Sequence, residues 1–567
     1  MRAEARSEAT PAATEPAPDP PASPAAQCLS RWRCAVGWTV YAIIAVIVIA
    51  FAGAVAAQSA VVQSAGAQAA AAATSAAQDY ATHCASCHGA DRLGGTGPAL
   101  LPENLERLRK PAATDTIAKG RLATQMPAFG DKLSKEAIDA LVAYVYTPPK
   151  HKPVWNAAEI AATRVVYHAD GTLPDKPQFT ADPMNLFVVV ETGDHHASIL
   201  DGDKLERIAR FPTRYALHGG PKFTPDGRYV YFASRDGWVT KYDLWNLKTV
   251  AEVRVGINTR NIAVSGDGKW VMAGNYLPHT LVVLDARDLS LVKVIPVADK
   301  SGRTSRVSAV YDAAPRKSFV AALKDIPEVW ELTYDPKAPP VYEGYVHDYR
   351  SGEGVAEKGA FPVRRIVLDD VLDDFFFDQS YDHLIGASRE AGKGQVVNLN
   401  VRRKIATVDL PGLPHLGSGI TWEWQGKPVL ATTNLKDGVV SVIDMKEWKT
   451  VGAIATNGPG FFLRSHEATP YAWVDAMNSP KKDTLQVIDK GTLAVVKALT
   501  PAPGKTAAHI EFDRYGKYAL ASVWETDGAI VVYDAATLTE VKRIPANKPV
   551  GKYNVYNKVT RSAGTSH

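Results

Sequence analysis

The chain has 567 residues, enough for two or three domains that each have a hydrophobic core. Its 64 basic and 60 acidic residues nearly balance and form no basic stripe or block, so the composition excludes a nucleic-acid-binding protein. Only four cysteines are present, and two of them, Cys28 and Cys34, lie near the N-terminus, which leaves the folded body without a disulfide framework.

The first 57 residues predict a leader that directs the chain to the periplasm. A start rich in Pro, Ala and Glu is followed by Arg31 and Arg33 and then by an uncharged, apolar stretch over 35–57. A positive flank, an apolar run and small residues are typical of an export signal, which we expect to be cleaved. The alternative is a retained membrane anchor, because the stretch is about long enough to span a bilayer. Residues 58–76, mostly Ala, Gln and Ser, follow as a flexible linker.

Residues 77–150 predict an all-α cytochrome c domain. They contain the sequence Cys84-Ala-Ser-Cys87-His88, whose spacing is the signature of covalent haem attachment. Positions i, i+3 and i+4 share one face of a helix. The thiols of Cys84 and Cys87 can therefore add to the haem vinyl groups while the His88 imidazole binds the iron. A zinc site, the alternative, would need more Cys or His nearby.

The sixth ligand of a c-type haem iron is usually Met or His. Between residues 89 and 150 the only methionine is Met126, and there is no histidine. We therefore predict that His88 and Met126 are the axial ligands of one covalent haem c. Such a pair raises the reduction potential and suits electron transfer.

After a linker over 151–163, residues 164–558 predict an all-β, eight-bladed propeller. A tight turn followed by a strand recurs, and each such unit leads to a second strand that ends in Asp, with endings 42 to 45 residues apart where the pattern is clear. The longer gap between Asp285 and Asp444 holds three further steps and an insertion near 337–365. Closure into a ring removes exposed sheet edges and fits eight units better than a solenoid.

Several side chains at related blade positions predict a ligand site at one mouth of the central channel. His218, Arg260 and His509 each precede the turn of their blade by six to eight residues, so we expect them at the same end. His415 lies a little further upstream in its own blade, whereas His466 falls close to a turn, which by pattern alone places it elsewhere. The pattern leaves metal ligation, tetrapyrrole ligation and acid–base catalysis open.

The order of the domains, with the segments Tyr215-Ala-Leu-His-Gly219, Leu413-Pro-His-Leu-Gly417 and Val550-Gly-Lys-Tyr-Asn-Val-Tyr-Asn557, resembles the cytochrome cd1 nitrite reductase superfamily over about residues 78–558. In that superfamily the propeller holds haem d1, a partly reduced tetrapyrrole. Within it the chain is most similar to the NirN-type branch, the dihydro-haem d1 dehydrogenases, which convert a propionate side chain into an acrylate. The segments that carry this closer resemblance are 369–378, 458–466 and 504–509.

The resemblance implies roles for residues on the propeller. His218 resembles the proximal d1 ligand of the reductases, and Arg260 resembles an arginine that binds a tetrapyrrole carboxylate. His415 and His466 resemble the distal histidine pair, which in the reductases donates protons to nitrite.

His509 and Tyr553 resemble an alternative iron ligand and an active-site tyrosine of the dehydrogenase branch. We therefore predict His509 as the ligand of the tetrapyrrole iron, with His218 as the alternative ligand. His415, His466 and Tyr553 are the predicted catalytic residues, with His415 as the base that removes a proton from the propionate.

The predicted function is that of a periplasmic oxidoreductase that desaturates dihydro-haem d1 and passes electrons to haem c. One alternative is a nitrite reductase that keeps haem d1 as a permanent cofactor, and another is a non-enzymatic carrier or assembly factor for haem d1. The implied partners are the tetrapyrrole substrate, a periplasmic electron acceptor and a nitrite reductase that receives haem d1. A membrane is a partner only if the N-terminal segment is retained.

Overall fold

The computed structural model describes residues 74–560 with gaps at 96, 106–107, 121–125, 152, 216, 218, 344–354, 358 and 388–391. The predicted leader, most of the predicted linker that follows it, and His218 therefore lie outside the described residues. Within the described part of the chain, no helix is long and apolar enough to cross a membrane.

Short helices build the N-terminal part. A helix over residues 74–83 leads into α2 (Ala85–His88), and three more helices follow: α3 (Pro102–Leu105), α4 (Lys110–Lys119) and α5 (Lys135–Val145). The Ser134 side chain caps α5 by accepting a hydrogen bond from the Ala137 N–H at 3.2 Å. Tyr80, Leu105, Leu141 and Val145 form the buried core of this unit. The prediction of an all-α haem-binding domain is confirmed.

The segment predicted as a second linker contains one more helix, α6 (Ala157–Ala162). Asn156 and Glu159 form a capping box at its start: the Asn156 side chain accepts from the Ala158 N–H at 2.8 Å, and Glu159 accepts from the Asn156 N–H at 2.8 Å. The connection between the two parts of the chain is therefore partly structured.

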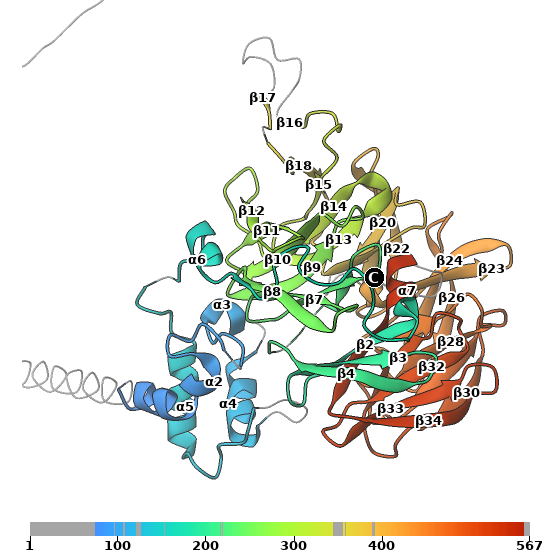
Figure 1. Cartoon of the computed structure of the whole chain (residues 1–567), viewed down its shortest axis with the longest axis horizontal. Helices are drawn as coiled ribbons and strands as arrows, with labels where there is room; N and C mark the ends of the chain where they lie inside the picture. The colour runs from blue at the N-terminus through green and yellow to red at the C-terminus, as the bar shows by residue number, and fades with distance from the viewer. Residues whose placement is uncertain are drawn as a thin grey trace, which may run out of the picture. The chain divides into compact units, whose positions relative to one another are not determined.

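Eight antiparallel sheets of four or more strands are arranged in a ring, as predicted (Figure 1). The first four sheets contain β2 (Leu186–Glu191), β3 (His196–Asp201) and β4 (Glu206–Pro212); β5 (Lys222–Phe223), β6 (Tyr229–Ala233), β7 (Trp238–Asp243) and β8 (Lys248–Arg254); β9 (Asn258–Val264), β10 (Trp270–Leu277), β11 (Thr280–Asp285) and β12 (Leu291–Pro296); and β13 (Val307–Ala313), β14 (Ser318–Leu323), β15 (Glu328–Thr333) and β18 (Val363–Val367).

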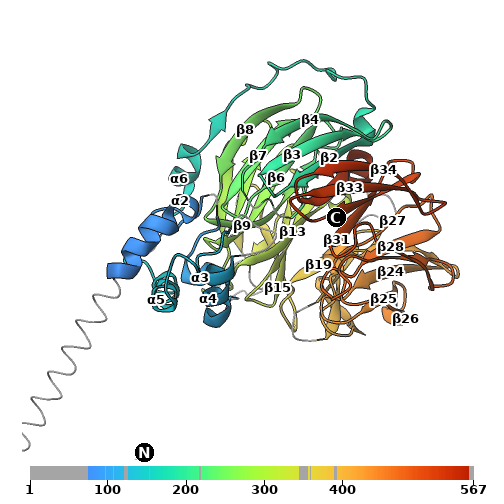
Figure 2. The same cartoon turned by 90° about the horizontal axis from the view of Figure 1, so that it is seen from below.

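The other four sheets follow the same order from the centre outwards, and Figure 2 shows β13, β19 and β31 towards the middle of the ring. These sheets contain β19 (Asp374–Phe377), β20 (His383–Ala387), β21 (Lys393–Asn398) and β22 (Arg403–Asp409); β23 (Ile420–Trp424), β24 (Lys427–Thr433), β25 (Val439–Asp444) and β26 (Lys449–Ala455); β27 (Leu463–Ser465), β28 (Tyr471–Asp475), β29 (Leu485–Asp489) and β30 (Val495–Leu499); and β31 (Ala507–Phe512), β32 (Tyr518–Val523), β33 (Gly528–Asp534) and β34 (Thr539–Ala546).

The C-terminal strand closes the ring. β35 (Pro549–Asn554) pairs antiparallel with β2, so that Tyr553 lies opposite Val188 and the last strand of the chain completes the first sheet. The helix α7 (Val555–Thr560) follows it directly. This pairing leaves no sheet edge open at the junction of the two ends of the propeller.

The remaining elements are short additions to this ring. A two-stranded sheet lies within the insertion predicted near 337–365. It is formed by β16 (Tyr342–Glu343) and β17 (Val355–Ala356). β1 (Val165–Val166) extends the second sheet by pairing with β8. In the described residues, 3-10 turns occur at η1 (Pro183–Asn185), η2 (Ala314–Arg316) and η3 (Leu416–Ser418).

The recurring turns that identified the blades contain glycine for a physical reason. Gly227, Gly268 and Gly516 have φ angles of +70°, +71° and +68°, a region that a residue without Cβ adopts at little cost. Each turn joins the innermost strand of a sheet to the next strand. The turns therefore lie at one end of each blade, and the loops that enter the innermost strands lie at the opposite end.

Candidate functional site

The haem-attachment motif is folded as its spacing predicts. Cys84 is the N-cap residue of α2, and Cys87 and His88 lie in that helix. Both cysteines are free thiols and half-buried. The His88 Nδ1 atom lies 2.8 Å from the Pro98 carbonyl oxygen, which accepts its proton and leaves Nε2 as a lone-pair donor. Burial lowers the pKa of His88, which keeps the ring neutral. These residues fit a covalently bound haem with an imidazole ligand.

The loop after α2 is packed tightly against the His88 ring. A Cβ atom on Gly97 would lie 2.6 Å from the ring carbon Cε1, so only glycine allows this approach. Arg92 is buried and donates hydrogen bonds to the carbonyl oxygens of Tyr144 and Thr147 at 2.8 and 3.0 Å. These contacts hold the motif against the C-terminal end of α5.

Met126 is partly buried and lies directly after the undescribed residues 121–125. The backbone at this point is packed against Gly120, where a Cβ atom would lie 2.9 Å from the Met126 carbonyl oxygen. The next turn is fixed by a hydrogen bond from the Phe129 N–H to the Ile117 carbonyl at 3.0 Å. The assignment of Met126 as the sixth iron ligand stays a prediction.

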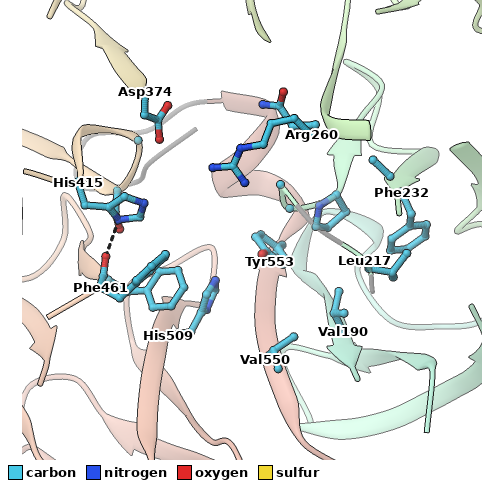
Figure 3. A pocket seen from close by; sticks show the side chains of 18 of the residues that line it. Val190, Leu217, Phe232, Arg260, Asp374, His415, Phe461, His509, Val550 and Tyr553 are labelled. Atoms are coloured by element: carbon cyan, nitrogen blue, oxygen red, sulfur yellow. Dashed lines mark hydrogen bonds between the residues drawn. The ribbon is translucent and has the colours of Figure 1, made fainter. Parts of the chain in front are cut away.

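A cavity of about 380 Å³ lies where the innermost strands of the propeller converge (Figure 3). Its volume is in the range of sites that bind small molecules and cofactors. Every sheet contributes to its wall: Val190, Val550 and Tyr553 from the first, Leu217 and Phe232 from the second, Arg260 and Asn261 from the third, Ser308 and Tyr311 from the fourth, Asp374 from the fifth, His415 from the sixth, Phe461, Phe462 and Arg464 from the seventh, and His509 and Trp524 from the eighth.

Four of the predicted propeller residues meet at this cavity: Arg260, His415, His509 and Tyr553. His218 lies outside the described residues, and its predicted role as a ligand stays a prediction. Its sequence neighbours Leu217 and Gly219 both line the cavity.

His466 does not line the cavity. Arg464 on β27 faces it, but His466 comes after the end of this strand, in the turn between β27 and β28, and packs against the neighbouring eighth sheet. Its ring lies 6.2 Å from that of Phe512, and a Cβ atom on Gly516 would lie 2.4 Å from its Nδ1. The predicted pair of His415 and His466 is therefore not formed, because the innermost strand carries His466 beyond the wall of the cavity.

His415 precedes η3, on the loop that enters the sixth sheet. Its Nδ1–H donates to the Phe461 carbonyl oxygen at 2.8 Å, and the rings of the two residues are 4.2 Å apart. Burial lowers the pKa of His415. The ring is therefore neutral, with Nε2 as a lone-pair donor suited to a metal or a proton.

His509 occupies a β-bulge in β31. Its φ angle is +52°, and the pairing register with β32 shifts between Ala508 and Ile510. A non-glycine residue in this region costs about 1–3 kcal/mol. The bulge explains why His509 lies on the cavity wall.

The electrostatics of His509 differ from those of His415. The Lys552 N–H faces its Nδ1 at 3.4 Å, and its buried Nε2 has no hydrogen-bond partner among the described residues. Burial, and then the Lys552 charge, hold the pKa of His509 well below its usual range. The ring is neutral, and its Nε2 carries the proton when Nδ1 accepts from the backbone.

Tyr553 packs against His509, with ring centroids 5.1 Å apart. Two glycines leave room for its phenol: Cβ atoms on Gly220 and Gly551 would lie 3.0 Å from its Cε1 and 2.7 Å from its hydroxyl oxygen. Burial raises the pKa of Tyr553 to about 12, although the Arg464 charge opposes this shift. The phenol is therefore protonated at neutral pH.

Two arginines give the cavity a positive wall. The Arg260 side chain projects into the cavity (Figure 3), and its Nε donates to the Ser308 carbonyl at 3.3 Å. Arg464 is buried; it donates to Ser418 Oγ at 3.0 Å, and its Nε has no hydrogen-bond partner among the described residues. Guanidinium groups placed in this way suit ligand carboxylates.

The sequence analysis missed Arg464 and Asp374 as individual site residues. Both lie in segments that carry the family resemblance, but neither has a spacing that marks it. Tyr311 OH donates to Asp374 Oδ1 at 2.8 Å, and a Cβ atom on Gly417 would lie 1.9 Å from the other carboxylate oxygen. Glycine at 417 therefore allows Asp374 to approach the loop that carries His415.

Fold and site together define a c-type cytochrome joined to a ligand-binding, eight-bladed propeller. The family model described as "Cytochrome D1 heme domain" matches residues 181–347 and 354–558. A second model, "Cytochrome C oxidase, cbb3-type, subunit III", matches residues 71–145.

The chain belongs to the dihydro-haem d1 dehydrogenase family. It is 57% identical over 488 residues to the dihydro-heme d1 dehydrogenase of Pseudomonas aeruginosa, and the match covers 86% of this chain and 95% of that protein. The solved structure of dihydro-heme d1 dehydrogenase NirN in complex with DHE matches with a TM-score of 0.76 and 56% identity, covering 85% of this chain and 98% of the other. The nitrite reductase of Stutzerimonas stutzeri is more distant, at 27% identity over 532 residues, covering 85% of this chain and 92% of that protein.

Proposed function

We propose that this protein is a dihydro-haem d1 dehydrogenase, which converts a propionate of the tetrapyrrole to an acrylate in the last step of haem d1 biosynthesis. The reaction removes two hydrogens, as two protons and two electrons. The observation that carries this function is the single cavity lined by Arg260, His415, His509 and Tyr553 in a chain that belongs to the dehydrogenase family. The protein carries a covalent haem c, and dihydro-haem d1 is its substrate.

The position of His466 favours the dehydrogenase over a nitrite reductase. The resemblance implied a distal pair of histidines that donates protons to nitrite, and only His415 of that pair lines the cavity. The lower identity to a nitrite reductase agrees with this preference. A cavity with one distal histidine retains an iron ligand but lacks the second proton donor.

His415 is suited to bind the tetrapyrrole iron. Its hydrogen bond to the Phe461 carbonyl fixes the Nδ1–H tautomer and turns a basic Nε2 towards a ligand, which is the usual support of a metal-binding imidazole. His509 holds the opposite tautomer and so offers an N–H. In our proposal the roles of these two histidines are the reverse of those predicted from the sequence. His218, predicted as the alternative ligand of the iron, stays a prediction.

His509 and Tyr553 then flank the reacting propionate, and Arg260 and Arg464 bind carboxylates of the substrate. The N–H of His509 can hold the propionate oxygen, while the Tyr553 hydroxyl takes part in proton removal. The Phe461 and Phe462 rings lie 4.7 Å apart between the two histidines and make this side of the cavity apolar. When bound, haem c accepts electrons one at a time and passes them to an outside acceptor.

The periplasm is the compartment that this chemistry requires. Attachment of haem to Cys84 and Cys87 needs reduced thiols in a compartment that otherwise oxidises them. We further propose a periplasmic electron acceptor as one partner and a nitrite reductase that receives haem d1 as another. The segment that decides between a cleaved signal and an anchor lies outside the described residues.

The test uses full-length protein from a host that cannot make haem d1. Such protein should contain haem c alone, bind added dihydro-haem d1, and convert it to a product that has lost two hydrogen atoms by mass when an electron acceptor is supplied. Nitrite consumption is measured beside it. Sustained nitrite reduction by d1-loaded protein, with no mass change in the added precursor, contradicts the proposal and supports the reductase.

A further inference from the structure

The bulge at His509 interrupts the regular pairing of the eighth sheet. On its two sides, Ala508 pairs with Ser522 and Ile510 pairs with Ala521, so His509 itself is the extra residue that has no partner in the ladder. The residue is also buried, and a buried peptide group that stays unpaired costs about 1–3 kcal/mol. The backbone of His509 therefore depends on groups outside its own sheet.

Two buried, charged side chains bind this backbone from the two neighbouring sheets. The Asp475 carboxylate, on β28 of the seventh sheet, accepts a hydrogen bond from the His509 N–H. The Lys552 amine, on β35 of the first sheet, donates to the His509 carbonyl oxygen and, at 2.8 Å, to Ser522 Oγ. The bulge is thus held on both sides, across the boundaries between sheets.

The amine of Lys552 is placed for this contact and not for contact with a ligand. Lys552 has no exposed surface, which is rare for a lysine and unfavourable unless its amine is hydrogen-bonded. It is not among the residues that line the cavity. Burial holds the pKa of the amine well below its usual range. A lysine is therefore kept at a costly position, where its amine contacts the bulge.

The strand that carries Lys552 also carries Tyr553. Consecutive side chains of a strand point to opposite sides, so the two residues reach different parts of their surroundings. The Lys552 N–H faces the Nδ1 atom of His509 at 3.4 Å, and the Tyr553 ring lies 5.1 Å from the imidazole. β35 and β31 belong to different sheets, so no backbone ladder joins them. Side-chain contacts therefore fix His509 relative to Tyr553.

We propose that Lys552 is a positioning residue for the dehydrogenation: by holding the His509 carbonyl, it keeps the His509 imidazole in the cavity wall beside Tyr553. This role rests on the proposed function, in which His509 and Tyr553 flank the reacting propionate. The φ angle of +52° at His509 is unfavourable for a residue with a Cβ atom, so the backbone needs support to keep it. Without the amine the bulge can relax, and a displacement of about 1 Å is enough to slow a reaction about 10²-fold.

The experiment compares full-length, haem-loaded wild type with Lys552→Met. Methionine has nearly the shape of lysine but no amine, so the contacts to His509 and Ser522 are lost. Turnover, followed as the loss of two hydrogens by mass, should fall about 10- to 10²-fold. The affinity for dihydro-haem d1 and the iron spectrum of the bound tetrapyrrole should stay close to those of wild type, because the proposed iron ligand and the two arginines keep their places. Spectral titration measures both.

Lys548→Met is the matched control. Lys548 is also buried and precedes the same strand, but its Nζ has no hydrogen-bond partner among the described residues. This variant should turn over like wild type. Ser522→Ala is a milder second variant: it removes one of the two acceptors of the Lys552 amine and should lower turnover by a smaller factor. The haem c spectrum and thermal unfolding check that each variant is folded.

A double variant tests whether Lys552 acts through His509. In a His509→Ala background the imidazole that Lys552 positions is gone, so the further change Lys552→Met should alter turnover by less than about 2-fold. Long single-turnover reactions measure these slow rates. If the two losses instead multiply in full, Lys552 acts elsewhere and the positioning role is wrong.

The other outcomes separate this role from the proposed function. A wild-type rate in Lys552→Met, or an equal loss in Lys548→Met, overturns the positioning role. So does a changed iron spectrum in Lys552→Met, because the amine would then act through the iron site. Should Lys552→Met fail to fold, a wild-type rate in Ser522→Ala contradicts the role. All these results leave conversion by wild type intact, whereas no mass change in wild type overturns the proposed function and the positioning role with it.

Discussion

The Nδ1 atom of His415 lies 2.8 Å from the carbonyl oxygen of Phe461, which enters the neighbouring sheet of the propeller. His509 faces the same cavity with its Nδ1 turned to the backbone N–H of Lys552. The two rings are thus held in opposite tautomers by backbone groups of different sheets. One offers a lone pair to the cavity and the other an N–H, and this difference is the basis of our proposal that His415 binds the metal and His509 the substrate.

We expect His415→Ala to change the iron spectrum of bound dihydro-haem d1. Losing the ligand should also weaken tetrapyrrole binding by about 10–100-fold or more, since loss of only the hydrogen-bond partner of a metal-binding imidazole typically costs that much. Spectral titration with the tetrapyrrole measures both effects. His383→Ala is the control, because His383 bonds to Asp378 and lies outside the cavity lining. An unchanged iron spectrum with slow conversion would instead make His415 the base.

Tyr553→Phe removes a single oxygen atom from the cavity wall. The ring should still fill the space beside Gly220 and Gly551, so binding of the tetrapyrrole stays close to that of wild type. Turnover should fall about 10²–10⁴-fold, the usual contribution of an acid–base group. Tyr242→Phe is the control, since Tyr242 is buried in the second sheet and stacks on Phe211. Equal turnover by wild type and Tyr553→Phe would remove the phenol from the reaction.

Met126→Ala should leave the haem attached through Cys84 and Cys87 but abolish the Met-ligated spectrum. The reduction potential should fall, because a Met ligand raises it. Met126→His provides a second test: the iron regains six ligands, yet the potential stays lower than in wild type. Redox titration of the isolated protein measures both. A wild-type potential and spectrum in Met126→Ala would assign the sixth position to another residue.

Local patterns in the sequence were sufficient to predict the fold and the haem-attachment site. The glycine turns recur with the blades, and the spacing of Cys84, Cys87 and His88 depends only on one helical turn. These features are set by neighbours in the chain. The sequence also predicted a closed ring, but the structure shows how the ring closes, by the pairing of β35 with β2.

Which side chains line the cavity depends on contacts between sheets, and a local sequence pattern does not predict these contacts. His466 and Arg464 are two positions apart, yet Arg464 lines the cavity and His466 packs beside Phe512. The bulge at His509 shifts the register by one residue, which a strict alternation does not predict. The tautomers of His415 and His509 are set by carbonyl and N–H groups on other strands. The family resemblance therefore identified these histidines but not the division of roles that we propose for them.

Asp475 connects the two histidines through hydrogen bonds to the backbone. Its carboxylate accepts the N–H groups of Phe461 and Phe462 at 2.8 and 2.9 Å, and it also accepts from the backbone of His509. Phe461 in turn holds His415. Asp475→Asn keeps the shape of the side chain but replaces one acceptor by a donor that faces an N–H. We expect the variant to disturb the iron spectrum and to lower turnover about 10-fold or more through both histidines.

The same residue predicts a dependence of stability on pH. Burial raises the pKa of Asp475 to about 6, and the backbone N–H groups oppose this shift only partly. Because its folded-state pKa lies above the unfolded value, the folded protein binds more protons between about pH 4 and pH 6. Stability should therefore decrease as pH rises through this window, by up to about 3 kcal/mol at this site. Denaturant unfolding of wild type and Asp475→Asn at pH 4 and pH 7 measures it: the stability of wild type relative to the variant should fall with rising pH. A relative stability that stays constant between the two pH values means that Asp475 ionises in the folded protein as it does in the unfolded chain, and contradicts the prediction.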